Sequence, residues 1–498
     1  MNVNPITRLD YPDPDVIRVE DTYYMVSTTM HFMPGCEILQ SFDLVHWEHV
    51  TYVYETLDHT DAQQLKSGQN IYGQGMWAAS LRYHEGRFYI CFVANDTRKT
   101  YLYTSEKIDG PWKKQLIEGF YHDGSLLFDE DGRNYIVYGN DEIWITELNE
   151  DLTAPKKDGL HRLLVSDHKN PELGYEGSHI QKINGYYYIF LIHSLRDRWM
   201  RTEACFYSDS LEGEFTGGDV LCDDRGYCGQ GVAQGGIVDT PDGKWYAMLF
   251  QDSGAVGRIP ILLPVTWKDH FPFFGQNGHM PEEIEVHSTR PGYIYQPLVG
   301  SDDFCNGLLP RWQFNHDPDP RYYHLDALQG TYTITTREVC TELTQAVNTL
   351  TQRMSYPSCA AEVTVDASAL KEGDVAGLCA LQSCYAAVGI TKHHGKYEVL
   401  MLDKKEDGIL DMTEGTVVES HQMDFRLEAD FCNMKDEARC YYRVNKGDWL
   451  PIGTVHKLYF KLDHFTGCRF GLFCYAAEET GGSACFRDFK YYDVDEIS

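Results

Sequence analysis

Three acidic side chains stand at matching places in a repeated pattern of this 498-residue sequence. They are Asp13 in YPDPD, Asp123 in HDGS and Glu176 in YEGS. Each is followed by a small residue or proline, a short apolar run, a tight turn and an aromatic run. Equivalent positions of a repeat that closes around an axis face a common centre. The pattern therefore predicts three carboxylates at one axial pocket.

Carboxylates grouped in this way can hydrolyse a glycosidic bond. An inverting glycosidase uses a general base to activate water and a general acid to protonate the leaving oxygen, with roughly 6.5–9.5 Å between the two carboxyl groups. A third carboxylate can raise the pKa of the acid and orient it. Taken singly, each residue has a structural alternative: a turn for Asp13, an Asx-turn for Asp123 and a capped strand end for Glu176. Their shared place in the repeat favours catalysis.

The elements that must position these acids are repeated hairpins. An acidic residue or Asn, usually followed by Gly, precedes an aromatic and apolar run five times: EDTYYMVST, EGRFYICFV, DGRNYIVYG, NGYYYIFLI and DGKWYAMLF. Asn-Gly and Asp-Gly tolerate the positive φ of tight hairpin turns. Intervals of roughly 45 to 65 residues match a four-stranded blade. We predict a five-bladed β-propeller over residues 1–290, and the alternative is five unrelated hairpins in a sandwich.

The pattern of residue types changes after the last hairpin. Residues 281–301 are turn-rich and lack the blade pattern, and we place a linker at 291–301. Runs such as GTYTITT and CAAEVTVDAS then alternate at period two, which is typical of a β-sandwich. We therefore expect an all-β chain with a sandwich over residues 302–498.

Charge and composition limit the classes of molecule that the protein is expected to bind. With 43 basic and 75 acidic residues, the net charge of −32 disfavours binding to nucleic acid or an anionic membrane. A neutral substrate fits best. The 34 tyrosines suit the faces of a sugar, although any large β-protein is rich in aromatic residues.

Cysteine usage and the N-terminal sequence point to a cytoplasmic protein. The 15 cysteines form no CxxC pair and many lie in apolar runs, so we expect buried free thiols in a reducing compartment rather than a zinc site. The N-terminal residues have neither the basic nor the apolar region of a signal peptide. No run of about 18 apolar residues is long enough for a membrane helix.

The motifs resemble, in order, those of family 43 glycoside hydrolases, the β-xylosidase and α-L-arabinofuranosidase family. The opening NPITRLDYPDPDVIRVEDTYYMVSTT and the later HDGSLLFDEDGRNYIVYG and YEGSHIQKINGYYYIF carry the likeness. RWQFNHDPDPRYYHL and KEGDVAGLCALQ resemble the concanavalin-like β-sandwich of β-xylosidase-type members. The resemblance covers nearly the whole chain.

The resemblance also implies roles for six residues. Asp13 would be the general base, Glu176 the general acid, and Asp123 the residue that tunes the pKa of the acid and orients it. Phe32 and Trp77 would be apolar walls of the sugar site, with core packing between blades as the alternative for both. Arg258 would donate hydrogen bonds to sugar hydroxyls, for which a planar guanidinium is suited.

One departure from the family pattern concerns a metal. Many members carry a histidine before the Gly-Gly of the fifth blade, where it often helps to hold calcium or a water cluster. Here Ala233 stands at that place, before Gln234. We therefore predict no metal ligands and no required cofactor; a structural calcium is left open but not predicted.

The leading prediction is an inverting exo-glycosidase that removes terminal β-D-xylosyl or α-L-arabinofuranosyl units from short oligosaccharides. The sequence does not choose between the two sugars. One alternative is a non-catalytic or degenerate sugar-binding propeller, and another is a retaining fructosidase, whose signatures are absent. The sandwich is expected to help close the pocket, with structural support or contact within a homo-oligomer as the alternative.

Overall fold

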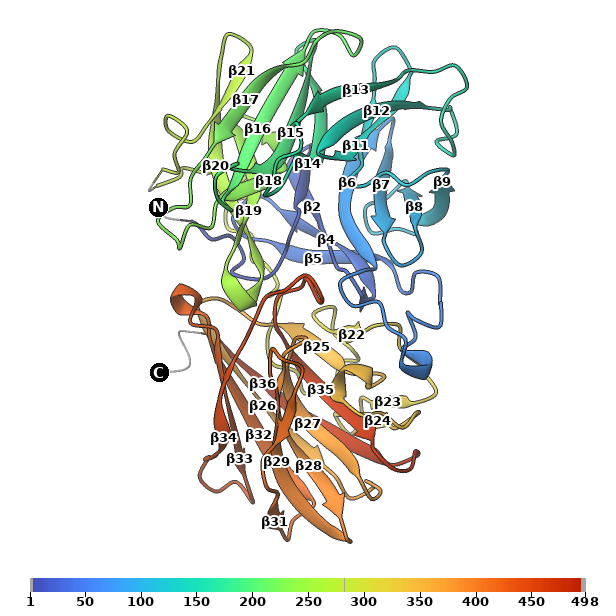
Figure 1. The fold of residues 1–498 in the computed structure, drawn as a ribbon, viewed down its shortest axis with the longest axis vertical. Helices are drawn as coiled ribbons and strands as arrows, with labels where there is room; N and C mark the ends of the chain where they lie inside the picture. The colour runs from blue at the N-terminus through green and yellow to red at the C-terminus, as the bar shows by residue number, and fades with distance from the viewer. Residues whose placement is uncertain (1–2, 282, 494–498) are drawn as a thin grey trace.

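The computed structural model describes residues 3–281 and 283–493. The chain forms two β-rich halves, drawn blue to green above and yellow to red below in Figure 1. The upper half contains five separate four-stranded sheets and the lower half contains two larger sheets. The predicted all-β fold, a five-bladed β-propeller followed by a β-sandwich, is confirmed.

Each blade is an antiparallel sheet whose strands follow one another in chain order, and the first strands of neighbouring blades are in contact. Blades one and two contain β1 (Asp15–Val19), β2 (Thr22–Ser27), β4 (Gly35–Ser41) and β5 (Glu48–Tyr54), then β6 (Met76–His84), β7 (Arg87–Ala94), β8 (Lys99–Ser105) and β9 (Lys113–Ile117). Blade three contains β10 (Ser125–Phe128), β11 (Asn134–Asn140), β12 (Glu142–Leu148) and β13 (His161–Ser166). Blades four and five contain β14 (Glu176–Ile183), β15 (Tyr186–Ser194), β16 (Arg201–Ser208) and β17 (Thr216–Leu221), then β18 (Val232–Asp239), β19 (Trp245–Asp252), β20 (Arg258–Lys268) and β21 (Phe271–Phe274).

Tight turns join the first and second strands of the blades. Asn184 and Gly185 connect β14 to β15 with φ of 52° and 84°. Two successive positive φ values are the signature of a type I′ turn, which matches the twist of the strands that it connects. The aromatic run of each sequence repeat therefore forms the second strand of its blade, as Tyr186 does directly across from Ile183.

The ring closes between blades one and five. Val16 of β1 and Met248 of β19 belong to one apolar cluster between these blades. The N-terminal segment runs along β20. The Asn4 amide donates to the Leu262 carbonyl at 2.7 Å, and the Ile6 N–H donates to the Pro260 carbonyl at 2.9 Å. The chain start thus satisfies β20 backbone groups that β21 does not pair, because β21 reaches only Val265.

Two sheets form the sandwich. The nine-stranded sheet contains β3 (Phe32–Met33), β22 (Gln313–Asn315), β25 (Leu350–Arg353), β27 (Asp374–Leu381), β28 (Ala386–His393), β29 (Lys396–Lys404), β30 (Leu410–Met412), β31 (Thr416–Val418) and β35 (Arg469–Ala476). The seven-stranded sheet contains β23 (Tyr323–Asp326), β24 (Thr331–Thr335), β26 (Ser358–Asp366), β32 (Gln422–Asp430), β33 (Glu437–Arg443), β34 (Leu450–Lys457) and β36 (Ser483–Asp493). Short 3-10 turns are η1 (Lys66–Gly68), η2 (Gly254–Val256), η3 (Leu343–Gln345) and η4 (Cys432–Met434).

The two halves share one packed interface. Strand β3 leaves blade one and pairs with β22 of the sandwich. Ala255, Val256 and Ile259 of blade five belong to the sandwich core cluster. The segment between the halves lies on blade one, where the Gln296 N–H donates to Glu48 at 2.9 Å. These contacts fix the sandwich against one end of the propeller.

A buried ion pair crosses this interface. Arg353 of the sandwich lies 2.9 Å from Glu37 of blade one, and both side chains are at most 4% exposed. We expect Arg353→Ala to lower the free energy of unfolding by about 3 kcal/mol, because it removes the guanidinium partner of the buried Glu37 carboxylate and leaves His49, 3.0 Å away, as its remaining charged neighbour. Chemical denaturation checks this value for the first unfolding transition. The double variant Arg353→Met/Glu37→Leu should recover most of the loss, and a change below about 1 kcal/mol in the single variant would contradict the prediction.

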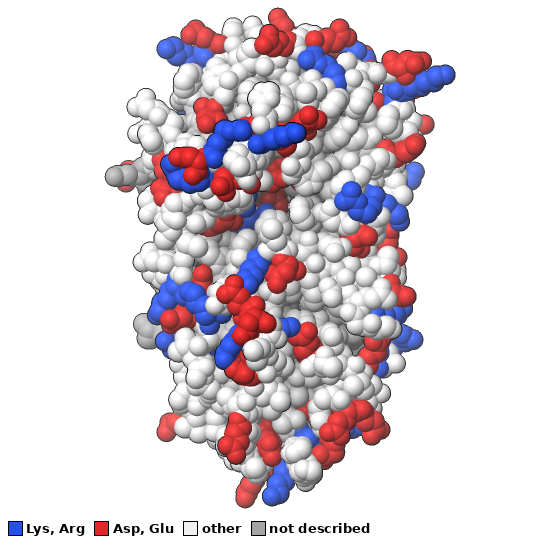
Figure 2. Space-filling view, viewed as in Figure 1, with Lys and Arg blue, Asp and Glu red and all other residues white. Residues whose placement is uncertain are grey.

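The charged surface of the chain is mixed. On the face shown in Figure 2, acidic and basic side chains are interspersed among uncharged residues, without an extended basic patch on that face. Among the described residues, none of the helices has the length and apolar character needed to cross a bilayer.

Candidate active site

The three predicted acids stand at the same end of the innermost strands. Asp13 lies two residues before β1, Asp123 two residues before β10, and Glu176 is the first residue of β14. Asp13 and Asp123 both have left-handed backbones, with φ of 53° and 48°. Non-glycine residues adopt this conformation uncommonly, and aspartate is among those that tolerate it. Asp13 and Asp123 thus share the same left-handed backbone two residues before the first strand of their blades, which directs both carboxylates from equivalent positions.

Asp13 is a buried carboxylate with two charged or polar partners. Its Oδ1 accepts from Nη1 of Arg258 at 2.8 Å, and its Oδ2 accepts from the Thr28 hydroxyl at 2.6 Å. Asp15, two residues later, is also buried but is bound to Arg82 at 2.8 Å and to His179 at 3.1 Å. Asp15 is therefore occupied in joining the blades, whereas Asp13 belongs to the polar cluster at the strand ends.

Asp123 is a buried carboxylate that interacts electrostatically with both of the other acids. Its Oδ2 accepts from the Gly177 N–H at 2.9 Å, which links it directly to the residue after Glu176. Burial raises the pKa of Asp123 to about 6. The charge of His122 opposes this rise, while the charges of Glu176 and Asp13 add to it. The three acids therefore act on one another electrostatically.

Glu176 is the most accessible of the three acids, with 18% of its side chain exposed. Its Oε2 accepts from Nδ2 of Asn140 at 2.7 Å and lies 3.4 Å from Nε2 of His122. The β14–β15 register shifts between Glu176 and His179. A β-bulge redirects a side chain, so the bulge sets the direction in which Glu176 leaves the strand.

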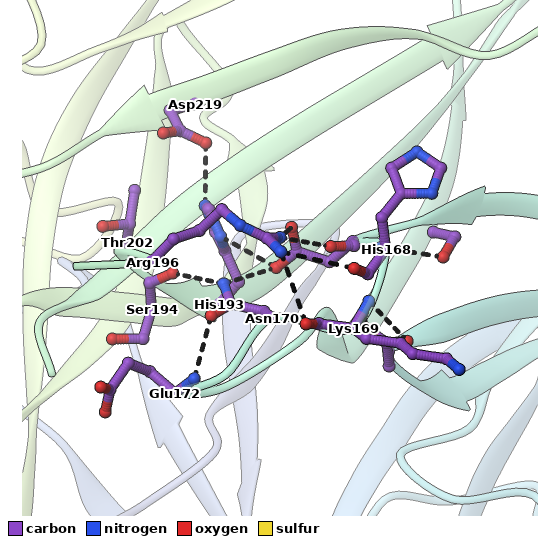
Figure 3. Close-up of polar contacts among 12 residues, drawn as sticks. His168, Lys169, Asn170, Glu172, His193, Ser194, Arg196, Thr202 and Asp219 are labelled. Atoms are coloured by element: carbon purple, nitrogen blue, oxygen red, sulfur yellow. Dashed lines mark hydrogen bonds and ion pairs between the residues drawn. The ribbon is translucent and has the colours of Figure 1, made fainter. Parts of the chain in front are cut away.

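The segment before Glu176 is held by a polar network, which Figure 3 shows. The Asn170 amide donates to the Ser194 carbonyl at 2.8 Å. Nη1 of Arg196 donates to the Asp167 carbonyl at 2.6 Å. These contacts join the loop after β13 to the loop after β15. The chain that enters β14 therefore has a fixed path up to the acid.

His122 was missed by the sequence analysis, although it directly precedes Asp123. Its Nε2 lies 3.5 Å from Asp123 Oδ2 and close to Glu176. Burial alone would lower the pKa of His122, but the charges of Asp123 and Glu176 outweigh it and raise this pKa to about 9. At neutral pH a protonated imidazole therefore compensates the charge of the two carboxylates.

The raised pKa of His122 predicts a loss of stability on the alkaline side. The stabilisation by its charge is fully present below the ordinary histidine pKa of 6.5 and disappears as the pH rises to about 9. It amounts to at most about 3 kcal/mol. We expect Tm to fall more steeply between pH 6.5 and pH 9 for the wild type than for His122→Gln. Thermal unfolding at a series of pH values measures both slopes, and parallel slopes would contradict the prediction.

Trp77 and Arg258, both predicted as pocket walls, lie beside the acids. The rings of Trp77 and His122 are 5.8 Å apart, and Arg258 holds Asp13. Nε1 of Trp77 and both Nε and Nη2 of Arg258 are buried without a hydrogen-bond partner in the described part of the chain. Unpaired buried donors of this kind, next to the three acids, call for a partner such as a bound ligand or water.

Phe465 completes this wall from the sandwich. Its ring centroid lies 5.6 Å from that of Trp77 and 4.1 Å from the guanidinium carbon of Arg258. Asp10 fixes the relative position of the two halves here, because its carboxylate accepts the backbone N–H groups of both Arg258 and Gly467, at 2.8 and 2.7 Å. No local pattern in the sequence marks Phe465, which is about 450 positions from Asp13.

Phe32 differs from the expectation for a pocket wall. It belongs to β3, and its ring packs in an apolar cluster with Tyr385 and Phe473 of the sandwich. The guanidinium carbon of Arg469 lies 3.4 Å from its ring centroid, and only 2% of the residue is exposed. Phe32 therefore serves the interface between the halves, because β3 has left its blade to join the sandwich sheet.

Ala233 and Gln234 pack against other propeller residues. Ala233 is buried with Ile192 and Phe250 and offers no ligand atom. Gln234 instead packs against Gly177, where a Cβ atom would lie 2.7 Å from the Gln234 side chain. Elsewhere in the described chain, His122, Asp123 and Glu176 offer three ligand atoms within 4.8 Å of one another, and such a set can hold a metal ion.

Comparisons with known proteins agree with this geometry. Residues 3–272 match the model of glycosyl hydrolases family 43, and residues 301–492 match that of the β-xylosidase C-terminal concanavalin A-like domain. A β-xylosidase of Formosa agariphila is 26% identical, with 99% of this chain and 89% of that protein covered. A xylosidase/arabinosidase 43B of Humicola insolens is 25% identical over 98% of this chain and 96% of that protein.

A solved structure is more similar still. The bifunctional GH43-CE protein of Bacteroides eggerthii has a TM-score of 0.92 and 42% identity over 99% of this chain. This chain spans 64% of the length of that protein. The prediction of a glycoside hydrolase is confirmed in preference to that of a non-catalytic sugar-binding propeller. With its propeller and its sandwich both matched, this chain is a glycoside hydrolase and belongs to family 43.

Proposed function

We propose that this glycoside hydrolase releases terminal β-D-xylosyl and α-L-arabinofuranosyl units from short oligosaccharides with inversion at the anomeric carbon. The observation that carries the proposal is the convergence of Asp13, Asp123 and Glu176, from three different blades, beside Trp77 and Arg258. The names of the relatives, β-xylosidase and xylosidase/arabinosidase, support the two sugars.

Asp13 acts as the general base in this proposal. Arg258 and Thr28 each donate to one of its oxygens and so fix the plane of the carboxylate. A water molecule beside Asp13 gives up a proton to it while the oxygen attacks the anomeric carbon. Arg258 also places a positive charge 2.8 Å from this buried carboxylate.

Glu176 acts as the general acid. It protonates the glycosidic oxygen as the bond to the anomeric carbon breaks, so that the leaving sugar departs as a neutral alcohol. Asn140 orients its carboxyl group through a hydrogen bond of 2.7 Å. Asp123 is bound to the backbone next to Glu176, and its charge interacts with those of Glu176 and Asp13.

An exo mode of attack follows from the way the site is closed. Phe465 of the sandwich packs on Trp77 and Arg258 of the propeller. A sugar bound beside Trp77 and Arg258 is covered by Phe465 on the sandwich side, which favours a terminal unit over the middle of a polymer. The sandwich in this proposal is part of the active site and not only a support.

The test is hydrolysis of 4-nitrophenyl β-D-xylopyranoside and of 4-nitrophenyl α-L-arabinofuranoside, with proton NMR of the xylose freshly released from the first of them. We expect turnover of both glycosides and α-xylose as the first sugar released. Failure to hydrolyse either substrate would overturn the proposed sugars. Release of β-xylose first would overturn inversion.

We further propose that the enzyme works in the cytoplasm on imported oligosaccharides. The support is that all 15 cysteines are free and most of them are buried, which is typical of proteins from a reducing compartment. Fractionation of cells that produce the native protein, with activity measured in each fraction, tests the location. Activity in the extracellular fraction of intact cells would contradict it.

A further inference from the structure

Arg82 of blade two reaches three other blades at the propeller axis. Its Nη1 donates to Asp15 of blade one and its Nε to the Leu126 carbonyl of blade three, both at 2.8 Å. Its Nη2 donates to the Ser125 hydroxyl of blade three at 2.7 Å and to the Ile180 carbonyl of blade four at 3.2 Å. The fifth hydrogen bond goes from Nη1 to the backbone of its own strand at 2.6 Å. A guanidinium carries five N–H donors in a fixed fork, so every donor of Arg82 is used.

The partners of Arg82 follow the three acids closely in the chain. Asp15 stands two residues after Asp13, and Ser125 stands two residues after Asp123. The contact with blade four falls on β14, the strand that Glu176 begins. Two residues of chain span at most roughly 7 Å. A shift of these partners is therefore passed to the acids over a short length of backbone.

Backbone pairing does not fix the three strands that follow the acids relative to one another. Strands β1, β10 and β14 are described in full and belong to three different sheets, so no β-ladder joins them. The apolar packing between blades is non-directional, whereas a hydrogen bond requires a particular distance and angle. Arg82 therefore supplies a directional link among these strands that the ladders do not provide.

The partners of Arg82 also bind one another. The Ile180 N–H donates to the Ser125 hydroxyl at 3.0 Å, and Nδ1 of His179 lies 3.1 Å from Asp15. Burial alone would raise the pKa of Asp15, but the charges of Arg82 and His179 outweigh it and lower this pKa. Asp15 is therefore ionised at neutral pH, and the side chains of its salt bridge with Arg82 are only 1% and 13% exposed. We call Arg82, Asp15, Ser125, His179 and Ile180 the axial cluster.

A cavity of about 410 Å³ adjoins the axial cluster at the propeller end away from the acids. Its walls come from the first strands of all five blades, and Arg82 lines it together with Ile17, Leu127, Gln181 and Val238. The acids stand at the starts of these strands, whereas the cavity lies farther along them. A small cation can therefore approach Arg82 without passing the sugar site.

We propose that Arg82 is a positioning residue for the hydrolysis, which holds β1, β10 and β14 in place and so sets the geometry between the base Asp13 and the acid Glu176. The inference rests on the proposed function, because it uses the roles given to these two acids. Arg82 itself touches no substrate and transfers no proton. A displacement of about 1 Å far from the chemistry can cost roughly a hundredfold in rate. Loss of the axial cluster should therefore lower kcat more than it changes KM.

The deciding variant is Arg82→Lys. Lysine keeps a positive charge beside Asp15 but has three donors on one nitrogen and lacks the fork that reaches three blades. We expect kcat on 4-nitrophenyl β-D-xylopyranoside to fall by about ten- to a hundredfold, with KM changed by less than about threefold. The rates are measured well below the Tm of the variant, with circular dichroism to show that it is folded.

Chemical rescue separates positioning from stability. We expect millimolar guanidinium chloride to restore part of the kcat that Arg82→Ala loses, because the free cation can enter the far cavity and occupy the place of the missing side chain. Sodium chloride at the same concentration should not restore it. The circular dichroism of Arg82→Ala at the assay temperature should be the same with and without guanidinium, which a gain through refolding would not allow.

Arg18→Ala is the matched control. Arg18 lines the same cavity and joins two blades, since its Nε donates to the Asp239 carbonyl of blade five at 3.1 Å. It stands near the end of β1, away from the acids. We expect this variant to have a lower Tm, the kcat of the wild type and no response to guanidinium.

Three results would overturn the inference: an unchanged kcat in folded Arg82→Lys, an equal loss of kcat in Arg82→Lys and Arg18→Ala, or failure of Arg82→Lys to fold. The last would show that Arg82 serves the stability of the propeller instead. A wild-type protein inactive on both nitrophenyl pentosides would overturn the proposed function, so the two failures are distinguishable.

Discussion

Asp13→Ala is expected to lower kcat/KM by about 10²–10⁴ on xylobiose and on 4-nitrophenyl β-D-xylopyranoside alike. A general base acts on the attacking water, and both substrates are attacked by the same water. The loss in kcat/KM should therefore be similar for a poor leaving group, such as xylose, and a good one, such as nitrophenolate. Initial rates on the two substrates measure the loss.

Asp13→Ala also leaves the buried Arg258 without its charged partner, so a loss of folding must be separated from a loss of chemistry. Sodium azide provides the separation, because azide needs no base and can occupy the space of the missing carboxylate. We expect azide to restore part of the hydrolysis of the nitrophenyl glycoside and to yield the α-xylosyl azide, the product of inversion. An unaltered Tm with no rescue, or a loss confined to one substrate, would contradict the assignment of Asp13 as base.

The repeat explains how much of the site could be predicted. Asp13, Asp123 and Glu176 occur at one place in three blades, and a propeller brings equivalent places together around its axis. Their selection needed no long-range information. Asp15 shows the limit, because a pattern of residue types does not tell it from Asp13. Only its contacts with Arg82 and His179 show that it joins blades.

The parts that escaped prediction depend on contacts between the two halves. Phe465 reaches the site from a sandwich loop, and its place is fixed by the Asp10 carboxylate, which accepts the Gly467 N–H. Phe32 lies in the sequence where a pocket wall was expected, but β3 pairs with β22 and carries it into the sandwich interface. No periodicity within either half reports a pairing between them.

His122 illustrates a different limit. Its neighbour in sequence, Asp123, was recognised because it shares its place in the repeat with Asp13 and Glu176. Nearby carboxylates raise the pKa of a histidine, and for His122 one of them is Glu176 from another blade. The sequence contained the residue, but its charge is a property of the assembled site.

The leaving group distinguishes the general acid from the base. Glu176→Ala is expected to lower kcat/KM on xylobiose by about 10²–10⁴, because a sugar alkoxide cannot leave without a proton. On 4-nitrophenyl β-D-xylopyranoside the loss should be about tenfold or less, since nitrophenolate leaves unprotonated. The ratio of the two losses is therefore the measurement, and it is unaffected by any partial unfolding, which would reduce both rates equally.

Asn140→Ala provides the matched control for this ratio. It removes the hydrogen bond that orients the acid but leaves the carboxyl group in place. We expect kcat/KM to fall more on xylobiose than on the nitrophenyl glycoside in this variant too, but with a smaller ratio of the two losses. The carboxyl group can still donate its proton, and only its orientation is lost. Equal losses on xylobiose and on the nitrophenyl glycoside in Glu176→Ala would remove Glu176 from the role of acid. Asp123, whose pKa burial raises to about 6, would then be the carboxylate to test as the acid.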